Sequence, residues 1–558
     1  MKAEGRRQKA EVRTSRIVFC LLTSAFCLLP SSARASHVTA KSAALSTAHP
    51  LSTKVGLAVL QRGGNAVDAS VAVAFALAVV HPQAGNLGGG GFLIYYDAST
   101  QAVWTLDFRE VAPLAATRDM FASNAKLART GARAIGVPST VAGLAAVHEK
   151  FGSQPWKQLL GPAIALAREG FVADAELASD VAEAKRERGI DTLTVKTGER
   201  FAQPELASTL QRIAERGARD FYEGDTAKRL VEGVRAGGGI LGFRDLREYE
   251  PLWRAPLKLR LGAYDIYTLA PPSGGGIVIG ETLNILASDD LAAAGFQTPK
   301  SIHLLVEAQR RAYIDRNKYL GDPFSARIPL RDLLSRRRAA EWRKSIDLVR
   351  ATATSMLTEP ATLTAEGEHT THFTIADAHG NIAAITTSLG DNFGSGFLAP
   401  GLGFFLNNAM DDFTLDAATA NRDALKQGVM NAIEPGKRPA TSMSPTIILR
   451  DAKPYLALGT RGGPSIPNTI VQVFLNVVVY GKSLPDAVAA PRFHHQGVPE
   501  DLSFERERTP AKTLEMLNAM GHGMTSRESI GDVHALLFEK GKIIAVADPR
   551  RGGAAGGY

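Results

Sequence analysis

The segment 370–388 predicts a buried β-hairpin, and its pattern decides which residues face each other. Its first part alternates in polarity as a half-buried strand does, and its last part is rich in β-formers. A turn containing Gly380 separates the two. Centring this turn on His379 places Thr370 opposite Ser388. One face of the first strand then carries His372, Thr374 and Ala376, and the other carries Thr371, Phe373 and Ile375.

This pairing has a chemical consequence if the bond between His369 and Thr370 is cut. Thr370 then gains a free α-amine. Its hydroxyl can act as the nucleophile, and its amine can act as the base that a threonine hydroxyl needs. The ordinary pKa of an α-amine is about 8, so with modest help from its surroundings much of the amine can be uncharged near neutral pH. Directly opposed residues have Cβ atoms about 5 Å apart, which puts the Ser388 hydroxyl beside that of Thr370. The alternative is an ordinary hairpin with surface threonines.

The first 35 residues have the composition of a cleaved signal peptide. A basic start precedes a short apolar run at 17–30, and 33–35 (ARA) fits a small-x-small cleavage site. The run is shorter than the ~20 residues that span a bilayer, so we expect no stable membrane anchor. Both cysteines lie in this segment, so the mature chain would have neither disulfides nor thiolate chemistry. We expect a periplasmic protein, with secretion as the alternative.

Length and charge narrow the function classes further. The chain has 558 residues and is 45% hydrophobic and 22% charged, which is ordinary for a globular protein. Of the formal net charge of +8, residues 1–35 carry +5, which leaves +3 for the mature chain. This excess is too small to predict nucleic-acid binding.

Several segments predict the elements around the hairpin. Residues 52–62 and 65–80 predict two helices, the second apolar on nearly every face and therefore buried. A glycine run at 88–91 precedes a predicted strand at 92–96; such a run can hold a phosphate, but the lysine of a P-loop is missing. Residues 140–350 predict mainly amphipathic helices. We expect their charged residues to be solvated, for example Glu307, Arg310, Arg311, Asp315 and Arg316.

A second predicted hairpin ends in a glycine-rich turn. Strands at 446–450 and 455–458 lead into 459–463 (GTRGG), and Ser465 begins an apolar helix. A glycine turn at a helix start directs free backbone N–H groups at one point, which can hold a phosphate or stabilise an oxyanion. The alternative is a plain tight turn.

Other candidate residues remain open at this level. The pairs His369/His372 and His494/His495 suggest a metal, but their spacing points each pair apart and no third ligand follows, so we predict none. Arg109, at a strand end, either binds a carboxylate or forms a structural ion pair. The acidic pair 411–412 could hold an amine, cap a helix or carry a proton.

Taken together, the motifs resemble the γ-glutamyltransferase (γ-glutamyl transpeptidase) family of N-terminal nucleophile hydrolases. The resemblance extends from about residue 41 to Tyr558. The segments that carry it are GGNAVDA (63–69), HPQAGNLGGGGF (81–92), DFREVAP (107–113), PPSGGG (271–276), TTHF (370–373), NNAMDDF (407–413), KRPATSMSPTI (437–447), GTRGG (459–463) and PRFHHQ (491–496).

The resemblance implies an α+β fold, a four-layer αββα sandwich with two mainly antiparallel sheets between helical layers. It implies a precursor that cuts itself between His369 and Thr370 into a large subunit, 36–369, and a small subunit, 370–558, which form one intertwined heterodimer. The expected reaction transfers or hydrolyses the γ-glutamyl group of glutathione and similar amides through an acyl-enzyme on Thr370. Amino acids or peptides would act as acceptors, and no cofactor is needed.

The resemblance also assigns roles to individual residues. Ser388 would hydrogen-bond the nucleophile, and Gly462 and Gly463 would form the oxyanion hole. The four residues that would hold the glutamyl end are Arg109 on the α-carboxylate, Thr441 and Ser442 as hydroxyls that assist it, and Asp412 on the α-amine.

Three departures from the family pattern leave the substrate open. Gly390 and Ala409 stand where the family commonly has side chains that help to hold the γ-glutamyl end, and 414–431 lacks the usual proline-rich lid. A glutaryl or cephalosporin-type acylase is therefore an alternative, although Asp412 would then lack an amine partner. An uncleaved, non-catalytic solute-binding protein is the third hypothesis.

Overall fold

The computed structural model describes residues 35–357, 370–416, 421, 425 and 427–558. The predicted signal peptide (apart from Ala35), His369 and part of the 414–431 segment lie outside the described residues. Within the described part of the chain, no helix has the length and apolar character needed to cross a membrane.

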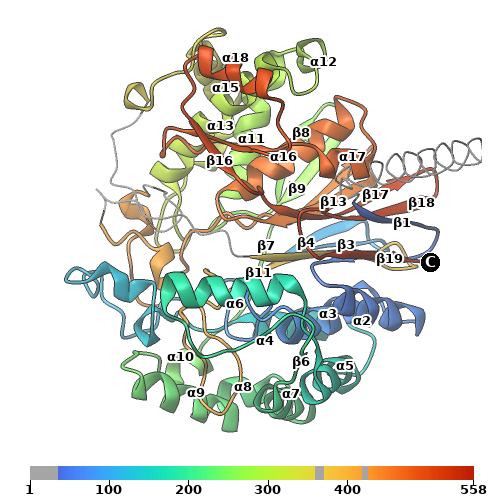
Figure 1. Ribbon diagram of the computed structural model, residues 1–558, viewed down its shortest axis with the longest axis vertical. Helices are drawn as coiled ribbons and strands as arrows, with labels where there is room; N and C mark the ends of the chain where they lie inside the picture. Colours follow the sequence, from blue (N-terminus) through green and yellow to red (C-terminus); the bar gives the residue numbers. More distant parts are fainter. Residues whose placement is uncertain (1–34, 358–369, 417–420, 422–424, 426) are drawn as a thin grey trace, which may run out of the picture. The chain divides into compact units, whose positions relative to one another are not determined.

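Two seven-stranded sheets, antiparallel throughout, form the middle of the fold (Figure 1). The first sheet contains, in spatial order, β19 (Ala554–Gly557), β2 (Ala44–Thr47), β10 (Thr371–Ala376), β11 (Ile382–Ser388), β3 (Gly90–Asp97), β4 (Ala102–Phe108) and β7 (Leu252–Arg254). The second contains β1 (Ser36–Ala40), β18 (Lys542–Ala547), β17 (Asp532–Glu539), β13 (Lys453–Arg461), β12 (Thr446–Arg450), β9 (Tyr264–Thr268) and β8 (Leu257–Leu261). Smaller sheets join β14 (Phe493–His494), β15 (Leu502–Glu505) and β16 (Met524–Arg527), and β5 (Phe171–Val172) and β6 (Arg200–Phe201).

Helices cover the outer face of each sheet, so the layers follow the predicted αββα order (Figure 1). The helices on the side of the first sheet are α2 (Pro50–Gln61), α3 (Ala66–Val80), α4 (Thr140–Phe151), α5 (Trp156–Glu169), α6 (Ala175–Arg188), α7 (Pro204–Arg216), α8 (Arg219–Glu223), α9 (Asp225–Ala236) and α10 (Phe243–Arg247). Those on the side of the second are α11 (Gly275–Ile285), α12 (Leu291–Ala294), α13 (Pro299–Tyr319), α14 (Leu330–Leu333), α15 (Arg336–Lys344), α16 (Ser465–Val478), α17 (Leu484–Ala489) and α18 (Ala511–Ala519).

The alternating side chains of β10 contribute to two hydrophobic cores, one on each face of the strand. Phe373 and Ile375 pack into the core that includes α3, whereas Ala376 belongs to the core between the two sheets. Helix α3 is buried along its whole length and begins with a capping box between Asn65 and Asp68. The predicted alternation of faces and the buried second helix are therefore confirmed, but β10 is buried on both faces and not half-buried as predicted.

The glycine run 88–91 has a packing role that the sequence did not indicate. A Cβ at Gly88 would lie 2.2 Å from the Phe405 carbonyl oxygen, and one at Gly89 would lie 2.1 Å from the Ser388 carbonyl oxygen. A Cβ at Gly91 would come within 2.3 Å of a β11 carbonyl. The run is thus explained by close backbone approach to β11 and its neighbours.

The prediction that the charged residues of α13 are solvated is wrong. Glu307, Arg310 and Arg311 are fully buried, and Glu307 accepts hydrogen bonds from Arg310 at 2.8 Å and from Arg311 at 2.7 Å. Asp315 is likewise buried and pairs with Arg338. The counter-charges of Glu307 lie on the same 21-residue helix, and that of Asp315 comes from α15, so α13 is buried with these charges paired.

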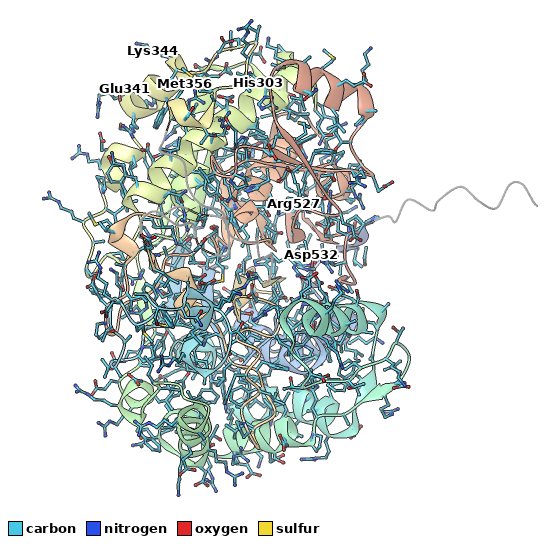
Figure 2. All side chains as sticks on the ribbon, turned by 60° about the vertical axis from the view of Figure 1, so that its left-hand side comes forward. His303, Glu341, Lys344, Met356, Arg527 and Asp532 are labelled. Atoms are coloured by element: carbon cyan, nitrogen blue, oxygen red, sulfur yellow. The ribbon has the colours of Figure 1, made fainter. Side chains whose placement is uncertain are left out.

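Replacing Glu307 by Gln should destabilise the protein strongly, because Arg310 and Arg311 would keep their buried charges without the carboxylate. We expect the free energy of unfolding to fall by about 3–5 kcal/mol in urea denaturation. Glu341→Gln is the matched control, because Glu341 (labelled in Figure 2) forms an exposed pair with Arg337 on α15. This substitution should change stability by less than about 0.5 kcal/mol. Equal stabilities of the two variants would contradict the account of α13.

Candidate active site

Thr370 lies directly before β10, opposite the end of β11. The observed register pairs Thr371 with Thr387 and Ala376 with Ile382, as the hairpin prediction requires. Thr370 is buried, and its Oγ1 donates a hydrogen bond of 3.4 Å to Oγ of Ser388. The structure therefore brings together the two hydroxyls that the sequence placed opposite each other.

Ser388 is held from several sides. Its strand pairs with β3, so that Ser388 stands beside Gly90. Its Oγ also accepts a 2.9 Å hydrogen bond from the backbone N–H of Gly390. Gly390 has a φ of +98°, a conformation that favours glycine. Glycine at this position, where the family commonly has a larger residue, therefore permits a backbone turn that directs the Gly390 N–H at Ser388.

The glycine turn after β13 adopts the predicted strand–turn–helix arrangement. Gly462 and Gly463 have φ values of +126° and +51°, and α16 begins at Ser465. The Gly462 carbonyl accepts hydrogen bonds from the backbone N–H of Ser465 at 2.9 Å and from its Oγ at 2.7 Å. These bonds fix the turn at the positive end of α16.

Arg109 follows β4 and is positioned through its own backbone. Its N–H donates to Oδ1 of Asp107 at 2.9 Å, and its carbonyl accepts from the Tyr249 hydroxyl at 3.0 Å. The guanidinium forms ion pairs with Glu110, at 2.6 Å, and with Asp412. Burial raises the pKa of Glu110, and the charge of Arg109 opposes that shift. The structure thus joins two residues, Arg109 and Asp412, that are 303 positions apart.

Thr441 and Ser442 are held by the glycine-rich start of α11. The Thr441 carbonyl accepts from the N–H of Gly274 at 2.7 Å, and its N–H donates to the Pro272 carbonyl at 3.1 Å. A Cβ at Gly275 would lie 1.5 Å from Oγ of Ser444. The segment 441–444 can therefore approach the start of α11 only because residue 275 is glycine. This contact accounts for Gly275, whereas a Cβ at Gly274 would meet Leu320 at 2.6 Å and one at Gly276 would meet the Leu269 carbonyl oxygen at 2.6 Å.

Most of the predicted site residues line one pocket. Gly462 adjoins this pocket without lining it, and His369 lies outside the described residues. The lining residues are Arg109, Arg316, Thr370, Ser388, Gly390, Asp412, Asn421, Leu425, Ala440, Thr441, Ser442, Met443, Gly463 and Ile466.

Arg316 is a pocket residue that the sequence reasoning missed. Its Nη1 donates to Oε1 of Gln427 at 2.8 Å, and Gln427 Nε2 donates to the Asp412 carbonyl at 2.9 Å. Asn431 Nδ2 donates to the same carbonyl at 2.7 Å. Arg316 therefore supports the short segment that carries Asp412. The sequence signal that could have identified Arg316 was the large number of charged residues on α13, but we expected these residues at the surface.

His372 connects strand β10 to the end of β13, which leads into the glycine turn at 462–463. Its Nδ1 and Nε2 hydrogen-bond the hydroxyls of Thr386 at 2.8 Å and Thr374 at 2.9 Å. Burial, with a contribution from His534, lowers the pKa of His372 well below its usual value, so the ring is neutral. A Cβ at Gly459 would lie 2.3 Å from this ring. The contact between the His372 ring and Gly459 thus sets the spacing between β10 and β13.

The histidines do not provide an open metal site in the described part of the chain. His494 is buried and hydrogen-bonds Gln496 at 2.8 Å. His303, Glu307 and His522 each place one ligand atom within 4.8 Å of the others, and His303 is labelled in Figure 2. However, His303 and His522 hydrogen-bond each other at 2.8 Å, and the arginines beside Glu307 would repel a cation.

Comparisons with known proteins identify extensive similarity. The family described as gamma-glutamyltranspeptidase matches residues 52–558. The chain is 37% identical to the glutathione hydrolase proenzyme of Escherichia coli (strain K12) over 534 residues, 92% of this chain and 91% of that protein. It is 39% identical to the glutathione hydrolase proenzyme of Pseudomonas aeruginosa over 555 residues, 96% of this chain and 98% of that protein.

Solved structures show the same fold. Cephalosporin acylase from Bacillus halodurans superimposes with a TM-score of 0.83 at 26% identity, covering 95% of this chain and 98% of that chain. Gamma-glutamyltranspeptidase from Pseudomonas nitroreducens, complexed with L-DON, gives a TM-score of 0.53 at 38% identity, covering 55% of this chain and 95% of that chain.

The contact between His372 and Gly459 can be tested by adding one methyl group. Gly459→Ala should force the ring from its place and cost about 1–3 kcal/mol of stability, with a loss of activity larger than the stability loss explains. Gly161→Ala in α5 is the control, because its Cβ would meet nothing within 4 Å. A Gly459→Ala protein that matches this control in thermal midpoint and turnover would refute the proposed spacing role.

Proposed function

Because the chain belongs to the gamma-glutamyltranspeptidase family and is an enzyme that transfers or hydrolyses γ-glutamyl groups, we propose that Thr370 is its catalytic nucleophile. The observation that carries this proposal is the convergence of the Thr370 hydroxyl with the Arg109–Asp412 pair in one pocket. A hydroxyl that lies beside a cation and an anion can attack an amide whose acyl group carries both a carboxylate and an ammonium. The family assignment favours this function over a non-catalytic solute-binding protein.

The first step is self-cleavage of the precursor. The Thr370 hydroxyl attacks the His369 carbonyl, the acyl group moves from nitrogen to oxygen, and water opens the resulting ester. The products are 36–369 and 370–558, which remain together as a heterodimer. The buried position of Thr370 beside Ser388 supports this step, as do the proenzyme names of the relatives.

The second step is acyl transfer to the freed residue. The Thr370 α-amine accepts the hydroxyl proton while Oγ1 attacks the γ-carbonyl carbon of the substrate. The N–H groups of Gly462 and Gly463 stabilise the oxyanion, each by about 3 kcal/mol. The C–N bond then breaks, and the leaving amine takes the proton. Water or an acceptor amine finally releases the glutamyl group from Thr370.

Recognition of the glutamyl end depends on an exchange of ion pairs. Without substrate, Arg109 and Asp412 neutralise each other. A glutamyl α-carboxylate would bind Arg109 and the α-ammonium would bind Asp412, so each buried charge keeps a counter-charge. Thr441 and Ser442 line the same pocket and add hydroxyl donors.

We also propose that residues 1–35 direct export to the periplasm, with secretion as the alternative. The basic start, the short apolar run and the small residues before position 36 support this assignment.

A glutaryl or cephalosporin-type acylase is the second candidate. Gly390 and Ala409 offer the glutamyl amine no side-chain partner, and the acylase from Bacillus halodurans shares the fold. Against it, a glutaryl group has no ammonium, so it would bind Arg109 and leave the buried Asp412 carboxylate without a counter-charge.

Turnover of two anilides distinguishes these candidates. We expect kcat/KM for a γ-glutamyl anilide to exceed that for a glutaryl anilide by on the order of 100-fold, because only the first has an ammonium for Asp412. Asp412→Asn should remove most of this preference. A wild-type protein that prefers the glutaryl anilide would instead establish the acylase.

The role of Thr370 in processing can be tested on a denaturing gel. The wild-type chain should separate into 36–369 and 370–558, whereas Thr370→Ala should remain a single band because it lacks the attacking hydroxyl. Thr371→Val is the matched control and should still be cut, since this neighbouring hydroxyl lies on the opposite face of β10. Cleavage at the same bond in Thr370→Ala would rule out the proposed self-cleavage.

A further inference from the structure

The loop that follows Ser388 has an unusual backbone. Gly390, Phe393, Gly394 and Gly396 all have positive φ values, between +56° and +98°. Phe393 is the exceptional member of this group, because a residue with a Cβ rarely adopts a left-handed conformation. Such a loop keeps its shape only where the contacts around it determine each turn.

The carboxylate of Asp391 lies at the centre of these contacts. The side chain is fully buried, and its Oδ2 accepts hydrogen bonds from Nε of Arg129 at 2.8 Å and from Nδ2 of Asn408 at 3.0 Å. Nη2 of Arg188 lies 3.6 Å from the same oxygen. The backbone N–H of Asp391 donates to Oδ1 of Asn408 at 3.1 Å, so these two residues hold each other at two points. One buried anion therefore serves two guanidinium groups, and its removal would leave both less compensated.

Arg188 also binds the backbone of the loop directly. This residue ends α6, and its Nη1 donates to the Asn392 carbonyl at 2.8 Å while its Nη2 donates to the Gly394 carbonyl. Between them, the N–H of Phe393 donates to the Gln83 carbonyl at 2.9 Å. These bonds hold three consecutive positions of the loop, which explains how the left-handed conformation of Phe393 is maintained.

Asn408 joins the loop to the segment that carries Asp412. Its N–H donates to the Leu389 carbonyl at 2.9 Å, and its Nδ2 donates to the Arg129 carbonyl at 3.1 Å. The short 3-10 helix that ends at Asp412 begins directly after Asn408. One asparagine therefore holds the loop and this segment together.

The position of the loop determines which groups reach Ser388. Its Oγ accepts hydrogen bonds from the Gly390 N–H at 2.9 Å and from Oγ1 of Thr370 at 3.4 Å. A hydroxyl oxygen has two acceptor positions, so these two bonds can use both. Because the Gly390 N–H is fixed on one position, the Thr370 hydroxyl has only the other. The loop thus sets the direction in which Thr370 meets Ser388.

We propose that Asp391 is a positioning residue for the reaction of Thr370 and acts through the Gly390 N–H on Ser388. The proposal rests on the function proposed for Thr370. It assigns no chemical step to Asp391 itself, which does not line the Thr370 pocket. The carboxylate gathers the side chains that hold the loop, and the loop orients Ser388 and, through it, the attacking hydroxyl.

Hydrolysis of a γ-glutamyl anilide measures this role. Asp391→Asn should lower kcat about 10-fold or more, because a small displacement of the reacting groups is enough for such a loss. KM should change by less than about 3-fold, since Gln427 and Asn431 still hold the Asp412 segment. The value of kcat is counted per processed chain, so a loss of folded or cleaved protein does not lower it. An unchanged kcat would overturn the proposal.

A double-mutant cycle with Ser388 separates positioning from a general structural effect. In a Ser388→Ala protein, Asp391→Asn should lower kcat further by less than about 2-fold, because the group through which Asp391 acts is absent. A loss as large in this background as in the wild type would contradict the proposed route. Asp191→Asn is the matched control, because it makes the same change in an exposed ion pair with Lys185 of α6 and should leave kcat unchanged in both backgrounds.

Asn408→Ala provides the same test if Asp391→Asn does not fold. This variant keeps the ion pairs between Asp391 and the two arginines and removes only the hydrogen bonds of the amide. Its kcat should also fall about 10-fold, and again much less in the Ser388→Ala background. An Asn408→Ala protein with the wild-type kcat would show that the loop does not need these contacts, and the proposal would be wrong.

Hydrogen exchange separates this inference from the proposed function. Asp391→Asn should speed amide exchange in the peptide that contains 389–394 by about 10-fold or more, because the loop opens more often, whereas Asp191→Asn should not. If no γ-glutamyl donor is turned over but this exchange pattern holds, the function of Thr370 fails while the loop contacts of Asp391 stand. If donors are turned over but neither exchange nor kcat responds to Asp391→Asn, the positioning role fails while the function stands.

Discussion

The antiparallel ladder between β10 and β11 is the constraint on which the rest of the site depends. Both strands lie inside the first sheet, with β2 on one side and β3 on the other, so neither can slide without breaking two pairings. A slip of one residue would turn Thr370 and His372 to the wrong face. Because the His372 ring also contacts Gly459, three residues before Gly462, the ladder sets the distance from Thr370 to the glycine turn at 462–463.

Buried charge is used in two different ways in this protein. On α13, Glu307 holds two arginines of the same helix in a buried network, and hydrogen bonds from this network reach Ser345, Thr352 and Thr354. In the pocket, Arg109 and Asp412 form a pair that a zwitterionic substrate can replace without leaving either charge uncompensated. The exchange that we propose would let this pocket select a γ-glutamyl group although Gly390 and Ala409 provide no side-chain contacts for the amine.

The sequence predicted what depends on local pattern. Period-two alternation and a glycine turn determine the hairpin register, and a strand–glycine–helix order determines the turn at 462–463. It could not predict that α13 is buried, because its packing depends on other elements of the fold, such as α15, whose Arg338 pairs with Asp315. Arg316 was missed for the same reason. From the sequence, Gly390 showed only that a side chain common in the family is absent. The structure adds that its φ of +98° suits glycine and that its N–H is directed at Ser388.

The central claim is that one threonine serves as chain start, base and acyl carrier. The most direct test is to quench the active protein with acid during turnover of a γ-glutamyl substrate and to map the modified peptide by mass spectrometry. The account predicts a γ-glutamyl ester on the Thr370 side chain of a fragment that begins with Thr370 and has a free α-amine. Active protein with an intact bond between residues 369 and 370, or with the ester on another residue, would contradict it.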